Sequence, residues 1–132
     1  MKITKAELIE LNACKRGLMR FIAQTNNTDE PVEVSSLVGG KNNYNDLVWL
    51  AGKKLPGERL VRFACDCALI NIEKIRLYTD EYEMIVDFLR NPTGVIAAAA
   101  AAAAADAAAA ADAWTAYGNR DKVDELLKEL FA

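Results

Sequence analysis

An alanine run between Val95 and Trp114, "VIAAAAAAAAADAAAAADAW", constrains the fold of this chain more than any other feature of its sequence. Alanine has the highest helix propensity of all residues, so the run predicts one long helix over residues 93–117 that ends at Gly118. Such a helix would be roughly 37 Å long at about 1.5 Å per residue. Because methyl side chains let neighbouring backbones approach closely, we expect this helix to be the central or seam element of the fold.

Two aspartates inside the run, Asp106 and Asp112, bear on its environment. Alanine is only weakly apolar and two carboxylates are costly in lipid, so we expect no membrane span here. The aspartates are separated by about 120° around a helix axis and indicate its wetter side. An open alanine face, used for self-association or for the helix of a partner, is the functional alternative to a buried helix.

Helical patterns continue through the rest of the chain. Thr4 and Glu7 have the spacing of a capping box at the start of the first predicted helix. In chain order we expect helices over residues 5–24, over 32–38 after Pro31, from an Asn43 cap to just before Pro56, over 56–77, from a Thr79 cap to Leu89, along the alanine run, and after Gly118. The fifth of these helices carries the apolar residues Met84, Ile85, Phe88 and Leu89. The last has an apolar face of Val123, Leu126, Leu127 and Leu130. No segment alternates convincingly with the two-residue period of a strand. We therefore predict an all-α fold, a single-domain bundle of about six or seven helices over residues 1–132.

The three cysteines indicate a reducing compartment. An odd number cannot form a complete set of disulfides within the chain, and the start "MKITKAELIE" has no apolar signal-peptide core, so we expect a cytoplasmic protein. Cys65 and Cys67 would point about 200° apart on a helix, which disfavours a shared metal or disulfide and favours burial as small apolar residues. A contact between Cys14 and one of them across two helices stays open.

Much catalytic chemistry is excluded by composition. The chain has no histidine, which removes every Ser-His, Cys-His and His-metal arrangement. Its paired carboxylates lie where acids favour the start of a helix, and "GGK" at residues 39–41 lacks the spacing of a phosphate-binding loop. We expect no enzyme activity, no catalytic residues, no metal site and no cofactor. Arg62 and Asp66 have the spacing of an ion pair on one helix face.

Charge is distributed unevenly along the chain. Residues 1–62 carry ten Lys and Arg against seven Asp and Glu, whereas residues 63–132 carry six against twelve. This acidic second half favours a basic partner, and a pI near 5.0 without a basic cluster argues against nucleic acid. The candidate partner-binding residues are the acids of the fifth helix, Asp80, Glu81, Glu83 and Asp87. A solvated helix start is the alternative role for these acids.

Two aromatic residues at the end of the alanine helix are further candidates for partner binding. Trp114 and Tyr117 are three residues apart and would share one helix face. Trp and Tyr often dominate the binding energy of protein interfaces, although core packing explains this pair equally well. Trp49, in the third predicted helix, we expect in the core.

One stretch of the sequence resembles a known family. "LVWLAGKKLPGERLVRFACDCA" at residues 47–68, with the earlier "ELNACKRGLMRF", is similar to small all-helical proteins of bacteria and tailed phages that are identified as immunity proteins of polymorphic toxin systems. The likeness extends through the Asn91-Pro92 break into the alanine-rich segment and covers about residues 10–113.

The resemblance implies a function of binding rather than catalysis. An immunity protein neutralises a toxin by covering its active site, and a phage relative would do the same to a host enzyme, in the host cytoplasm. The expected partner is therefore another protein, a toxin or host enzyme with a basic surface. The motif residues resemble core positions, so no site residue follows from the likeness. A structural module that associates with its own copies through the alanine helix is the alternative function.

Overall fold

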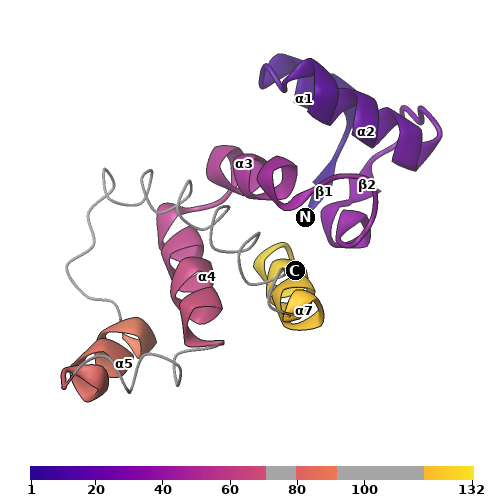
Figure 1. Cartoon of the computed structure of the whole chain (residues 1–132). Coiled ribbons are helices and arrows are strands. Elements are labelled where there is room, and N and C mark those ends of the chain that lie inside the picture. The colour runs from indigo at the N-terminus through magenta and orange to yellow at the C-terminus, as the bar shows by residue number, and fades with distance from the viewer. Residues whose placement is uncertain (71–79, 92–117) are drawn as a thin grey trace.

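Helices make up most of the part of the chain that the structure, a computed structural model, describes: residues 1–70, 80–91 and 118–132 (Figure 1). The elements are β1 (Lys2–Ile3), α1 (Lys5–Glu10), α2 (Lys15–Thr25), β2 (Val32–Glu33), the 3₁₀ helix η1 (Val34–Leu37), α3 (Tyr44–Lys54), α4 (Gly57–Leu69), α5 (Tyr82–Arg90) and α7 (Arg120–Leu130). The predicted all-α class is confirmed. The alanine helix, the predicted helix beyond residue 70 and the Thr79 cap lie outside the described residues.

The first predicted helix, residues 5–24, is wrong as a single element, because the chain turns between α1 and α2. The capping box of Thr4 and Glu7 begins α1 as predicted. At its other end Asn12 has a φ of 61°, its amide donates to the carbonyl of Ile9 at 3.0 Å, and the amide of Ala13 donates to the carbonyl of Leu8 at 3.0 Å. This is a Schellman motif, which ends a helix with a left-handed residue.

The predicted helix over residues 32–38 is also wrong in its first half. Val32 pairs with Ile3 and Glu33 with Lys2 in a short antiparallel ladder. The amide of Val34 extends the ladder by donating to the carbonyl of Met1 at 2.9 Å. Only the single 3₁₀ turn of η1 follows. Pairing with β1 provides the hydrogen bonds that a first helical turn would otherwise leave unsatisfied.

The later helices agree more closely with prediction. Asn43 caps α3 and forms a capping box with Asp46, and α3 ends at Lys54, before Pro56. In contrast, α5 begins only at Tyr82, with Glu81 as an N-cap that makes no side-chain capping bond. The backbone turns at Asp80 and Glu81, so the helix begins later than predicted.

The core joins the two ends of the described chain. Its largest fully buried side chains include Phe21 of α2, Val48 of α3 and Phe131 directly after α7. The predicted apolar face of α7 is confirmed, since Val123, Leu127 and Leu130 are buried against this core. The hydroxyl of Tyr44 donates to Asp124 at 2.7 Å and links α3 to α7. Trp49 packs against the core but is only half-buried.

Candidate functional site

The outward face of α5 carries exposed apolar side chains next to the acids that were predicted to bind a partner. Met84 is 61% exposed and Phe88 is 52% exposed. They are four residues apart and therefore lie in one row along the helix. Glu83 and Asp87, both exposed, are four residues apart in the adjacent row. We call these four residues, together with Asp80 and Glu81 in the preceding turn, the α5 face.

The opposite side of α5 is held against α4. Val86 is buried, and Leu89 packs against a small cluster of Val61 and Cys65, separate from the main core. The guanidinium of Arg62 on α4 donates to the carbonyl of Leu89 at 3.2 Å and to that of Arg90 at 2.5 Å. These are carbonyls at the end of α5, which a helix leaves without internal partners. Arg62 therefore caps α5 and fixes the orientation of its exposed face.

The structure describes four of the six predicted partner-binding residues. Asp80 and Glu81 lie in the turn before α5, Glu83 and Asp87 lie on α5, and all four side chains are exposed. Two of the four acids thus precede the helix on which they were predicted, and their role in binding stays a prediction. Trp114 and Tyr117 lie outside the described residues.

Sequence reasoning missed the exposure of Met84 and Phe88, which it grouped with the apolar residues of the fifth helix. Helical geometry could have predicted this exposure. Met84 and Phe88 lie roughly opposite to Val86 around the helix axis, so a helix that is buried on one side cannot bury all three side chains. The two helix faces are consequently different in character, one apolar and anchored, the other apolar, acidic and exposed.

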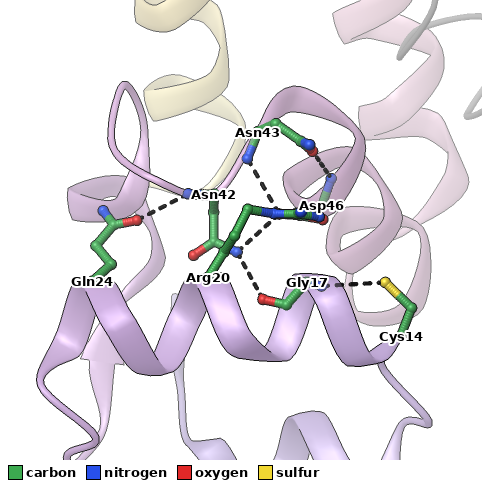
Figure 2. A network of polar contacts seen from close by, with 7 residues as sticks. All are labelled: Cys14, Gly17, Arg20, Gln24, Asn42, Asn43 and Asp46. Carbon is green, nitrogen blue, oxygen red and sulfur yellow. Dashed lines mark hydrogen bonds and ion pairs between the residues drawn. The ribbon is translucent and has the colours of Figure 1, made fainter.

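A second polar constellation lies between α2 and α3 (Figure 2). Arg20 makes a bidentate ion pair with Asp46, with its Nε and Nη2 each 2.7 Å from a carboxylate oxygen. Asn42, just before α3, donates from Nδ2 to Asp46 at 3.0 Å and to the carbonyl of Gly17 at 3.2 Å. The backbone N–H of Asn42 also donates to Oε1 of Gln24 at 3.1 Å. All of these contacts except that between Asn42 and Asp46 join α2 to the start of α3.

Two opposing effects, burial and hydrogen bonding, act on the carboxyl pKa of Asp46. Burial disfavours its charged form, but hydrogen bonds from Arg20, Asn42 and the Asn43 backbone outweigh the burial. The pKa of Asp46 is therefore below its ordinary value, and the hydrogen bond to Asp46 raises the pKa of Arg20. The pair is ionised at neutral pH and holds α2 and α3 in register.

The cysteines divide into two environments. Cys65 and Cys67 are buried, as predicted, and burial raises the pKa of Cys67 to about 12. Cys14 is exposed and caps α2, its Sγ accepting from the amide of Gly17 at 3.3 Å. All three thiols are free. The contact of Cys14 with Cys65 or Cys67, which the sequence left open, is not made as a disulfide.

Two further searches concern metals and membranes. Across residues 1–70, 80–91 and 118–132, no three side chains of His, Cys, Asp or Glu stand close enough together to hold a metal ion. In the same ranges, no helix combines the length and apolar character that a membrane crossing requires.

Compared with known protein families, curated proteins and solved structures, the chain gives no match. The resemblance to immunity proteins therefore stays a prediction, and the α5 face is the feature of the structure that bears on function.

Proposed function

We propose that this chain is a non-catalytic protein that binds a basic protein surface through the α5 face. The observation that carries the proposal is the exposure of Met84 and Phe88, each more than half accessible and adjacent on one helix. Large apolar side chains in such a row resemble the anchors by which helices dock against partners.

The acids around this apolar row define the kind of partner. Two of the acids, Glu83 and Asp87, lie in the row beside Met84 and Phe88, and the other two lie in the turn before α5. Arg90 is the basic residue of the same segment. A partner with an apolar depression bordered by Lys or Arg complements this arrangement in both shape and charge. Complementary charge chiefly accelerates association, while the buried apolar anchors slow dissociation.

Inhibition by occlusion is the finer part of the proposal. It is supported by the resemblance to immunity proteins and by the acidic character of the chain's second half, which suits an enzyme or toxin that itself binds acidic substrates. In this proposal the bound chain covers the partner's site and performs no chemistry.

A retention experiment tests the proposal with a matched control. The double variant Met84→Ala with Phe88→Ala removes the anchors, and Ile9→Ala with Met19→Ala removes two side chains that are similarly exposed, at 56% and 58%, on α1 and α2. The free energy of unfolding of both variants should be within about 0.5 kcal/mol of the wild-type value, because they change only surface residues. A protein that the wild type retains from a bacterial lysate should be retained equally by the control.

The α5 variant should bind that protein at least about tenfold more weakly in a titration with the purified partner, as expected for the loss of two interface anchors. Equal affinity of the α5 variant and the wild type would remove the α5 face from the interface. Loss of binding in the α1–α2 control alone would move the interface to the other end of the molecule.

A further inference from the structure

The outward face of α2 carries an exposed apolar side chain among positive charges. Met19 is 58% exposed. Lys15 and Ala23, four residues before and after it, lie in the same row along the helix and are exposed as well. Arg16, also exposed, lies one turn before Met19 in the adjacent row. We call these four residues the α2 face; the opposite side of the helix is buried at Phe21.

The charges of the α2 face and of the α5 face are free to pair with another molecule. The sequence of α2 contains three basic residues and no acid. Two of the three, Lys15 and Arg16, form no ion pair with another residue of the described ranges. The same holds for Glu83 and Asp87 on α5. Each helix therefore presents unpaired charges of one sign beside an exposed apolar row.

The two faces complement each other in spacing, size and charge. Met84 and Phe88 are four residues apart on α5, as Met19 and Ala23 are on α2. When the two helices are laid side by side in the same direction with the methionines opposed, the large ring of Phe88 lies over the small Ala23, which permits close approach. The acids of the α5 face then meet the bases of the α2 face, an arrangement that favours association.

The two faces of one molecule do not meet. In Figure 1, α2 and α5 lie at opposite ends of the described structure, with α3 and α4 between them. Two copies can bring an α5 face and an α2 face together, head to tail. Because such a contact joins different surfaces, each pair still has one free face of either kind, and further copies can be added.

From this complementarity we propose that the α5 face binds the α2 face of a second copy of this chain. The inference rests on the proposed function, since it uses the same α5 face to dock against a basic, apolar surface. Self-association covers that face, so a basic partner has to displace the second copy before it binds. Two short helix faces form a small interface, and we expect a dissociation constant of about 100 µM.

Sedimentation velocity of the wild-type chain, with a reductant to keep the exposed Cys14 from linking copies, tests the contact. Between about 10 µM and about 1 mM protein, the weight-average mass should rise above the 14.5 kDa of one chain. Raising the salt from about 20 mM to about 300 mM should increase the dissociation constant at least about tenfold, because opposite charges are screened. A mass that stays at 14.5 kDa throughout would contradict the proposal.

Two charge-reversal variants show whether these faces form the contact. Lys15→Glu with Arg16→Glu makes the α2 face acidic, and Glu83→Lys with Asp87→Lys makes the α5 face basic. Each variant alone has like charges on both faces and should stay monomeric at concentrations at which the wild type associates. An equimolar mixture has opposite charges again and should recover association. A mixture that stays monomeric, or either variant associating alone as the wild type does, would contradict a contact between these faces.

The control variant Lys122→Glu with Lys128→Glu changes the net charge as the α2 variant does, at exposed positions of α7. Its dissociation constant should be within about threefold of the wild-type value, and a loss of association equal to that of the α2 variant would contradict the specific contact. The proposed function fails separately. A monomeric wild type that needs Met84 and Phe88 to bind its partner contradicts self-association alone, and a self-associating wild type that binds its partner without them contradicts the proposed function alone.

Discussion

Asp46 is the residue on which most polar contacts between α2 and α3 converge. Its carboxylate accepts from Arg20, from Asn42 and from the backbone of Asn43, while its own amide donates to the Asn43 cap. Surface ion pairs contribute little to stability, but a carboxylate with several donors leaves them all unsatisfied when it is removed. The side chain of Asp46 is 12% exposed, so water replaces these contacts poorly.

Replacing this carboxylate should therefore be costly. We expect Asp46→Asn to lower the free energy of unfolding by about 2 kcal/mol at pH 7, since it breaks the pair with Arg20 and turns amide hydrogens toward other donors. Asp66→Asn is the matched control, because Asp66 pairs with Arg62 in a more exposed position on one helix. Its cost should be about 0.5 kcal/mol. Urea denaturation of the three proteins measures both values, and equal costs would contradict the special role of Asp46.

The same pair predicts a pH dependence. Since the folded-state pKa of Asp46 is lowered from 3.8, its contribution to stability is fully present above that pH. The contribution disappears as the pH falls below 3.8 through the lower folded-state value. The difference in stability between the wild type and Asp46→Asn should consequently narrow in acid, as denaturation curves at a series of pH values would show. A difference that stays constant down to the lowest pH would contradict the assignment.

At the scale of helices and strands, local signals could be read from the sequence and tertiary ones could not. The caps at Thr4 and Asn43 were predictable because a cap and its target lie within one turn. The break at Asn12 was not, because the apolar spacing runs through it and the left-handed Asn costs little. The ladder between Ile3 and Val32 joins segments 29 residues apart and leaves no two-residue pattern to detect.

The candidate site shows the same division. The acids of the α5 face were predicted from charge alone, whereas the exposure of Phe88 and the role of Arg62 depend on how α5 packs on α4. Arg62 was predictable only as the partner of Asp66, which lies four residues away on its own helix.

We accordingly expect Arg62 to stabilise α5 more than it stabilises the other helices. The variant Arg62→Met keeps an aliphatic stem but loses the bonds to the carbonyls of Leu89 and Arg90. We expect hydrogen exchange at α5 amides to become about tenfold faster, because the end of the helix opens more readily, with α1–α3 amides unchanged. Arg59→Met, an exposed change on the same helix, is the control and should leave α5 protection as it is. Unchanged α5 exchange in Arg62→Met would contradict the capping role.

At the scale of the whole molecule, charge and packing separate two regions. The main core joins β1, α2, α3, α4 and α7, while α5 is held on α4 by a small second cluster. In Figure 1 the described part of α5 lies at the far side of α4 from α1 and α2. An apolar, acidic helix face attached at the edge of a well-packed core can contact a partner without disturbing that core.

Association kinetics with the purified partner tests this account most directly. The variant Asp80→Lys with Glu83→Lys reverses two charges of the α5 face, and Glu125→Lys with Glu129→Lys makes the same change in net charge on exposed positions of α7. If the α5 face steers a basic partner, the first variant should associate at least about tenfold more slowly at low salt and lose most of its salt dependence, while the α7 variant changes far less. Equal association rates for the two variants would show that only net charge matters and would contradict the α5 face as the binding surface.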